Sequence, residues 1–349
     1  MSGQTQTERL VLQIHPKDNV AVAVKPLKKG TVLPGSVRLL EDLPQAHKAA
    51  MQTIAAGAPV IRYGVVLGHA VKEIPQGSWV REDMLHVADC PSLEGLTWGT
   101  HLVPAEELPE PPVRTWMGYR NAAGPAGTRN YLGIVTTVQC AAGVVRSVTE
   151  RIRRELLPKY PNVEGVVAIT HAYGCGVAIR AREAGIPIRA IRNIIQHPNF
   201  GGEAIVVGLG CEKLTYDMVL PPEKINAETC ITLQEQPGHA AMEQAILDLA
   251  EKKLRILNER RREELPLSEL CIGMQCGGSD AFSGISANPA AGCAADMLVR
   301  GGATVLFSEI TEVRDGVQLL AARCRDEETC RKLAREMDWY DRYLAEGGV

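Results

Sequence analysis

Runs of hydrophobic residues alternate with longer amphipathic stretches over residues 116–349. Five runs are short, rich in β-branched residues and bounded by glycine or polar residues, which is typical of buried strands. These predicted strands are Tyr131–Val138, Val163–Thr170, Ala204–Gly208, Leu270–Met274 and Ala303–Ser308. The predicted helices are Ala141–Leu157, Gly238–Arg261, Pro289–Arg300 and Glu327–Tyr343. Alternating strands and helices form βαβ units, so the pattern predicts a Rossmann-like α/β region with a mostly parallel sheet.

The first 90 residues follow a different pattern, in which short β-branched segments are separated by glycines. The segments with the length and composition of strands are Leu10–Ile14, Val20–Val24 and Pro59–Tyr63. A helical period is suggested only around Ala46–Ile54. The pattern therefore predicts a compact β module over residues 1–90. Residues 91–115 contain five prolines among acidic and polar residues, which favours an extended linker.

Composition adds mainly exclusions. A net charge of −3 gives no reason to expect binding to nucleic acid or to a membrane. No apolar stretch approaches about 18 residues without a charge, and the first ten residues lack the basic flank and apolar core of a secretory signal. Ten cysteines without such a signal favour the reducing cytoplasm. Since none of them is spaced as C-x-x-C, a zinc ribbon or a thioredoxin-type motif is not expected.

Residues capable of chemistry follow each predicted strand. In an open parallel sheet the carboxyl ends of the strands lie at one edge, and ligands bind there. The residues after the five strands are, in order, Cys140; His171 and Cys175; Cys211; Cys276 with Ser279 and Asp280; and Glu309. We therefore expect these residues to converge on one pocket rich in thiols.

Each of these residues also has a plainer interpretation. Cys140 lies where a helix begins, so the helix dipole would favour its thiolate, but a buried structural cysteine is equally consistent. His171 suits a metal ligand or a general base, although a lone histidine is more often structural. The segment Cys276–Gly284 has two adjacent glycines whose N–H groups can face an anion, and its Ser279, Asp280 and Ser283 can bind hydroxyls or a hard metal. Asn288 is expected to cap the following helix.

Several motifs resemble those of a known family. The segment His15–Asn19 resembles the start of an SAF-type β-clip domain found in sugar-acid dehydratases. The segments that resemble motifs of the altronate/galactarate dehydratase family are Gly127–Asn130, His171–Cys175, Gly208–Glu212 and Cys276–Asp280. The resemblance covers nearly the whole chain. Family members continue beyond this length, so we expect the C-terminal part of the catalytic domain, which occupies residues 116–349, to be missing.

The resemblance implies an iron-dependent hydro-lyase that dehydrates galactarate to 5-dehydro-4-deoxy-D-glucarate. Removing water from a dihydroxy acid needs a base for the proton next to the carboxylate, and a Lewis acid such as Fe²⁺, alone or in an iron–sulfur centre. The expected metal ligands are Cys140, Cys175, Cys211 and Cys276. The expected catalytic residues are His171, Asp280 and Glu309. The expected substrate-binding residues are Arg129, Ser279, Ser283, Asn288, His15 and His47. A cytoplasmic homodimer that binds a small aldarate is expected.

Three other functions are open on the sequence alone. The chain could be a non-catalytic fragment that binds a sugar acid or a metal. It could be a thiol redox protein, which would require two thiols within disulfide distance. It could also be a dehydratase of the same family that acts on altronate or on a sulfonated acid.

Overall fold

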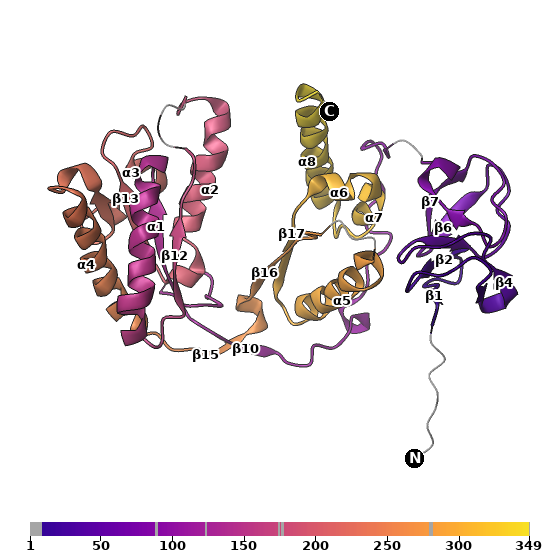
Figure 1. Cartoon of the computed structure of the whole chain (residues 1–349), viewed down its shortest axis with the longest axis horizontal. Coiled ribbons are helices and arrows are strands. Elements are labelled where there is room, and N and C mark those ends of the chain that lie inside the picture. The colour runs from indigo at the N-terminus through magenta and orange to yellow at the C-terminus, as the bar shows by residue number, and fades with distance from the viewer. Residues whose placement is uncertain are drawn as a thin grey trace, which may run out of the picture. The chain divides into compact units, whose positions relative to one another are not determined.

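Figure 1 shows the computed structural model of the chain, which describes residues 9–87, 90–122, 124–173, 175, 178–278 and 282–348. The chain divides into two units. The first unit consists of Met1–Pro109, Gly273–Met297 and Leu306–Val349. The second unit consists of Glu110–Ile272 and Leu298–Val305. Along the part of the chain that is described, no helix is both long enough and apolar enough to cross a bilayer.

The N-terminal part of the first unit is a β module built from short antiparallel strands. One sheet has the order β1-β2-β5-β8, formed by Val11–Leu12, Val20–Ala23, Lys48–Ala50 and Trp79–Val80. A second sheet has the order β6-β7-β9, formed by Pro59–Arg62, Val65–Ala70 and Leu85–His86. Strands β3 (Val32–Leu33) and β4 (Val37–Arg38) pair as a hairpin. The prediction of a β-rich module is confirmed, whereas the helical period around Ala46–Ile54 is wrong because β5 lies there.

The second unit contains a four-stranded parallel sheet in the order β12-β11-β13-β14. In that order the strands are Gly165–Ile169, Tyr131–Thr136, Ile205–Gly208 and Cys230–Thr232. Its helices are α1 (Ala142–Arg151), α2 (Gly185–Ile195), α3 (Tyr216–Val219) and α4 (His239–Asn258). Strands β11, β12 and β13 and helices α1 and α4 were predicted. The prediction missed β14 and α2; glycine and proline in the first turn of α2 weaken its helical signal.

The two faces of this sheet are covered by different helices (Figure 1). Leu132 and Ile134 of β11 pack with residues of α1 and α4, such as Val145 and Ile246. Val135, the next residue along the strand, packs on the opposite side with residues of α2 and α3. Successive residues of a strand point to opposite faces, so a strand covered on both faces must be apolar throughout. The burial pattern of β11 is apolar and buried from Leu132 to Val135, as this requires.

The last two predicted strands belong to a different sheet. Strands β16 (Cys271–Met274) and β17 (Thr304–Phe307) pair with each other in a two-stranded sheet. The prediction that all five strands share one sheet edge is therefore wrong for these two. Both strands are largely exposed rather than buried, and an apolar run does not by itself specify its partner strand. A further antiparallel pair joins β10 (Thr115–Gly118) to β15 (Glu263–Pro266).

Four helices follow in the last quarter of the chain. They are α5 (Ala287–Arg300), α6 (Ile310–Val313), α7 (Val317–Ala321) and α8 (Glu327–Glu346). Helix α8 begins where predicted, since the Asp326 side chain accepts the Thr329 N–H at 2.7 Å and so caps it. Asn288 lies inside the first turn of α5 rather than before it, so its predicted capping role is wrong.

Candidate functional site

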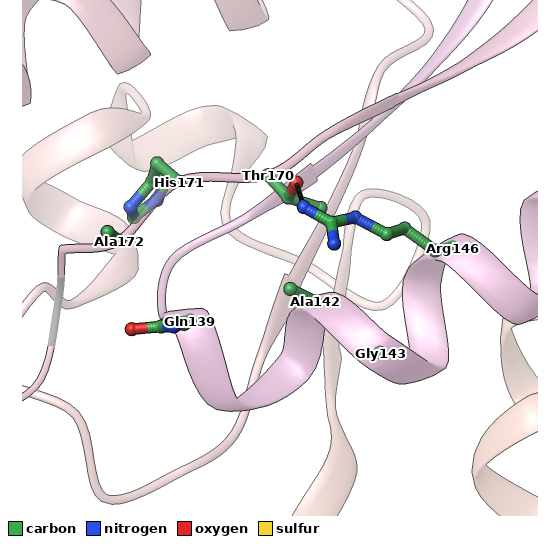
Figure 2. Close-up of a pocket in the computed structure, with 7 residues that line it drawn as sticks. All are labelled: Gln139, Ala142, Gly143, Arg146, Thr170, His171 and Ala172. Atoms are coloured by element: carbon green, nitrogen blue, oxygen red, sulfur yellow. Dashed lines mark hydrogen bonds between the residues drawn. The ribbon is translucent and has the colours of Figure 1, made fainter.

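A pocket of about 460 Å³ lies at the carboxyl ends of β11 and β12 in the second unit (Figure 2). Its lining residues are Gln139, Ala142, Gly143, Arg146, Thr170, His171 and Ala172. The loops after the two strands are tied together because the Gln139 N–H donates to the Tyr173 carbonyl at 3.2 Å. The pocket therefore occupies the edge of the parallel sheet at which ligands bind in α/β proteins.

His171 is held firmly at one end of this pocket. Its Nε2 lies 2.7 Å from the Thr136 carbonyl oxygen, and its Nδ1 accepts the Tyr173 N–H at 3.0 Å. A carbonyl only accepts hydrogen bonds, so Nε2 carries the proton. Burial lowers the pKa of His171 by more than the hydrogen bond to Thr136 raises it. The imidazole is therefore neutral at pH 7 and offers no free nitrogen, so the predicted role as a base or ligand would need the ring to turn out of this position.

Arg146 brings a positive charge to the same pocket. It extends from α1, and its Nη2 donates to the Thr170 hydroxyl at 2.7 Å (Figure 2). The structure shows no ion pair for this guanidinium among the residues it describes. An arginine without a counter-ion beside a pocket suits a carboxylate ligand. Arg146 was not predicted from the sequence, because nothing in the local pattern distinguishes it from other arginines on a helix surface.

The Gly208–Glu212 segment is shaped by its own carboxylate. Glu212 accepts hydrogen bonds from the Thr137 hydroxyl at 2.6 Å and from the N–H groups of Leu209 and Gly210 at 2.9 and 2.6 Å. Burial raises the pKa of Glu212, but these hydrogen bonds outweigh that effect and lower it. Glu212 is therefore an ionised group that fixes the turn after β13 and leaves Cys211 exposed.

The described residues do not form a metal centre. Cys140, Cys175 and Cys211 are all free and exposed in the second unit. Within the described ranges, no three side chains of His, Cys, Asp or Glu lie close enough together to hold a metal ion. Since Cys276 lies in the first unit, the ligand set of Cys140, Cys175, Cys211 and Cys276 stays a prediction, and no step of the chemistry below is assigned to a metal.

The first unit brings together three other residues selected from the sequence. The Cys276 N–H and the Gln275 side chain donate to the two oxygens of Glu309, both at 3.4 Å. The Asn288 amide lies 3.7 Å from the Cys276 Sγ. Glu309 follows β17 and has a left-handed backbone, with φ 70° and ψ 64°. A non-glycine residue in this region is strained, and such strain occurs preferentially at functional sites.

The remaining predicted residues lie elsewhere or outside the described part. Ser279 and Asp280 lie outside the described residues, and Ser283 begins the short helix η12 (Ser283–Ile285). His47 accepts the indole N–H of Trp79 at 3.2 Å, and His15 accepts the Lys17 N–H at 3.2 Å, both within the β module.

Arg129 has a partner of its own. It precedes β11, so it lies at the amino end of that strand, whereas the pocket lies at the carboxyl end. Its Nη1 pairs with Glu164 at 2.8 Å. The carboxylate that Arg129 binds in this structure is therefore one supplied by the protein.

Three family models match successive parts of the chain. Residues 9–88 match the altronate/galactarate dehydratase SAF domain. Residues 118–258 match the second domain of D-galactarate dehydratase/altronate hydrolase. Residues 267–349 match the C-terminal region of D-galactarate/altronate dehydratase.

Curated relatives give the same result. The chain is 51% identical to galactarate dehydratase (L-threo-forming) of Escherichia coli (strain K12) over 346 residues, which cover 96% of this chain and 66% of the relative. It is 32% identical to altronate dehydratase of Bacillus subtilis (strain 168) over 339 residues, 95% of this chain and 66% of the relative. A (2R)-sulfolactate sulfo-lyase subunit beta of Chromohalobacter salexigens is 26% identical over 229 residues, 65% of this chain and 54% of that protein. The chain thus spans 66% of the length of these two dehydratases.

Proposed function

The chain belongs to the galactarate dehydratase family, and on this premise we propose that it is a hydro-lyase that removes water from galactarate. The proposed product is 5-dehydro-4-deoxy-D-glucarate. The observation that carries the proposal is the high identity to a galactarate dehydratase along nearly the whole chain. Altronate is the second candidate substrate, since altronate dehydratases are related over the same range at lower identity.

The reaction sets clear chemical requirements. A base removes the proton from the carbon next to a carboxylate, and the neighbouring carbon loses its hydroxyl group, which leaves as water after protonation. The resulting enol then rearranges to the ketone. The protein must hold the carboxylate with cations, and it must fix a base close to the reacting carbon.

We assign the base to Glu309. Its support is the strained backbone, the position two residues after β17, and the hydrogen bonds that join both carboxylate oxygens to Gln275 and Cys276. Backbone strain at one residue is expected where the position of its side chain matters more than local stability. In the second unit, the pocket beside Arg146 supports a separate role in holding an anion.

The family resemblance also leads us to propose dependence on Fe²⁺ and a cytoplasmic homodimer. Thiolates are the kind of donor that iron–sulfur centres use. These proposals rest on the resemblance alone, because no group of three His, Cys, Asp or Glu side chains that could hold a metal is found within the described ranges. Metal analysis of protein purified without oxygen tests the dependence on Fe²⁺. Light scattering during size-exclusion chromatography tests the homodimer.

A thiol redox function is less well supported. Cys324 and Cys330 are both buried in the first unit. Burial and the neighbouring Cys330 raise the pKa of the Cys324 thiol. A raised pKa leaves little thiolate at neutral pH, so the Cys324 thiol lacks the reactivity that a redox thiol requires.

The test is a direct assay with matched variants. Purified chain is incubated without oxygen, with Fe²⁺ and galactarate, and loss of galactarate and formation of the ketone are followed by NMR. Activity is expected with the unchanged chain and with Cys293→Ser, which alters an exposed thiol on α5. Cys276→Ser should abolish it. If the chain consumes altronate but not galactarate, altronate is the substrate. If it consumes neither, the result favours the non-catalytic alternative.

A further inference from the structure

The N-terminal β module carries a hairpin whose tip is unusually well fixed. Strands β6 and β7 are joined by Tyr63 and Gly64, which both have positive φ, 59° and 73°. This two-residue turn matches the twist of antiparallel strands. Asp18 accepts the Gly64 N–H at 2.8 Å, and the Asn19 side chain accepts the Ile61 N–H at 2.7 Å. The Asp-Asn pair in the motif at residues 15–19 therefore holds the tip in place.

The tip of this hairpin contacts the end of the Cys276–Gly284 segment. The Tyr63 hydroxyl donates to the Gly284 carbonyl at 2.6 Å, and the Arg62 Nη2 donates to the Tyr63 hydroxyl at 3.0 Å. The Arg62 guanidinium carbon also lies 4.4 Å from the centre of the Tyr63 ring. A Cβ on Gly284 would lie only 2.9 Å from Arg62 Nη2, so the missing side chain leaves room for the guanidinium. Both contacts lie within the first unit.

The carboxylate at this tip, Asp18, accepts backbone N–H groups, and the described part of the chain shows no ion pair between it and a cation. The structure shows no ion pair for Arg62 or Lys48 within the described ranges, and the buried Nε of Arg62 has no hydrogen-bond partner there. Lys48, on β5, is half-buried. Burial lowers the pKa of Lys48, and the nearby charge of Arg62 lowers it further. Two partly buried cations without a counter-ion are unfavourable unless an anion joins them.

We infer that Arg62 and Tyr63 form a carboxylate-binding site of the first unit beside Gly284, to whose positive charge Lys48 contributes. The guanidinium is only partly buried, so its outer N–H groups can reach an oxyanion, and their planar fork matches a carboxylate. That the anion is a carboxylate of a sugar diacid rests on the proposed function. The presence of the anion site rests on the buried Arg62 Nε, which has no hydrogen-bond partner within the described residues, and on the positive charge beside it.

If the contact between the hairpin and Gly284 were purely structural, the positive charges would not be needed. The Tyr63 hydroxyl by itself joins the hairpin to Gly284, so neither positive charge is needed for that contact. Lys48 has no hydrogen bond in it at all within the described residues. The charges are therefore the property that separates an anion site from a simple contact between two loops.

The test measures binding by the full chain, using calorimetry with galactarate. Arg62→Gln should weaken binding by about 10- to 100-fold, the usual loss for a hydrogen bond to a charged group. Lys48→Gln should weaken binding in the same direction by a smaller factor, because it removes a nearby positive charge. Lys28→Gln removes an equal charge from the same module, where Lys28 is exposed and paired with Asp42, and it should change affinity by less than about twofold. Arg62→Lys should fall between, because it keeps the charge and loses the fork. Melting temperatures verify that each variant is folded.

Some results would overturn this inference, and others would change only the proposed ligand. Unchanged affinity in Arg62→Gln and Lys48→Gln, or an equal loss in Lys28→Gln, overturns the inference. The same is true if Tyr63→Phe, which keeps both charges, reproduces the whole loss. Sulfate serves as a second probe. If sulfate binds in an Arg62-dependent way and galactarate does not bind, the anion site stands but its ligand is not a sugar diacid. If neither binds, the inference is overturned. Turnover of galactarate with an unchanged KM in Arg62→Gln removes the site but leaves the proposed function.

Discussion

At the scale of single residues, the structure shows that the backbone of Glu309 is strained. Its left-handed backbone costs about 1 kcal/mol or more relative to an ordinary conformation. Glycine adopts this region without strain. Since this backbone conformation favours glycine, we expect the carboxylate to be the reason for a glutamate at position 309.

Two substitutions separate these contributions. Glu309→Gln should lower kcat by about 10²- to 10⁴-fold, because the amide keeps the shape but cannot accept a proton. Glu309→Gly should abolish activity while leaving the melting temperature unchanged or higher. The exposed neighbour Glu312 supplies the control, since Glu312→Gln should leave both quantities unchanged. Equal activity in Glu309→Gln and in the unchanged chain would rule out Glu309 as the base.

His171 leads to a prediction about pH. Its pKa is lowered in the folded protein, so below the ordinary value of about 6.5 the unfolded chain binds the proton first. Its contribution to stability is present above that pH and is lost as the pH falls through the lowered pKa. The free energy of unfolding should therefore fall less between pH 7.5 and pH 5.5 in His171→Gln than in the unchanged chain. His101→Gln, at an exposed position, is the control and should fall as the unchanged chain does.

The same scale shows why arginines were hard to assign. Arg129 lies in a family motif, yet its partner is Glu164 of the same chain. Arg62 and Arg146 stand in no motif that marks them, and within the described residues the structure shows no ion pair for either. Whether an arginine is free depends on which carboxylates the fold brings to it, and those lie far away in sequence.

At the scale of elements, the hairpin β6–β7 depends on a residue outside it. Asp18 accepts N–H groups from Ile14, His15 and Gly64. Burial raises the pKa of Asp18, but the N–H groups of Gly64, His15 and Ile14 together lower it. A single carboxylate thus ties the motif at residues 15–19 to the turn that carries Tyr63.

Replacing this carboxylate should loosen the hairpin. Asp18→Asn should cost about 1–3 kcal/mol at pH 7, because the neutral amide accepts these hydrogen bonds less well. Since the folded pKa is lowered, the difference should be present above about pH 4 and disappear as the pH falls through the folded pKa. Calorimetric unfolding at several pH values measures it. Asp83→Asn, at an exposed residue in a long ion pair with Arg81, should cost less than about 0.5 kcal/mol, and an equal cost would contradict the role of Asp18.

Elements with a strong local signal were predicted well. Helix α4 was expected at Gly238–Arg261 and spans His239–Asn258, because its apolar residues repeat at helical spacing over five turns. Strands β11 and β13 were found within two residues of their predicted ends. Helix α2 was missed, since a proline three positions into a short helix looks like a loop.

At the scale of the whole molecule, the main error concerned the pairing of strands. Strands β11, β12 and β13 share a parallel sheet as predicted, and β16 and β17 pair separately. The expected convergence on one sheet edge holds for Cys140, His171 and Cys211, which follow the first three strands. It does not hold for Cys276 and Glu309, which follow the other two and contact each other instead.

The sequence by itself determined the family, the β-rich start, the alternation of strands and helices, and the residues that follow each strand. These properties are local, or are carried by short motifs, so they can be read along the chain. Only the tertiary structure decided which strands pair, that both His171 nitrogens are engaged, that Arg129 is paired, and that neither Arg62 nor Lys48 has an ion-pair partner in the described part of the chain. Each depends on contacts between distant segments, and the hydrophobic pattern that drives burial does not specify which polar partners burial brings together.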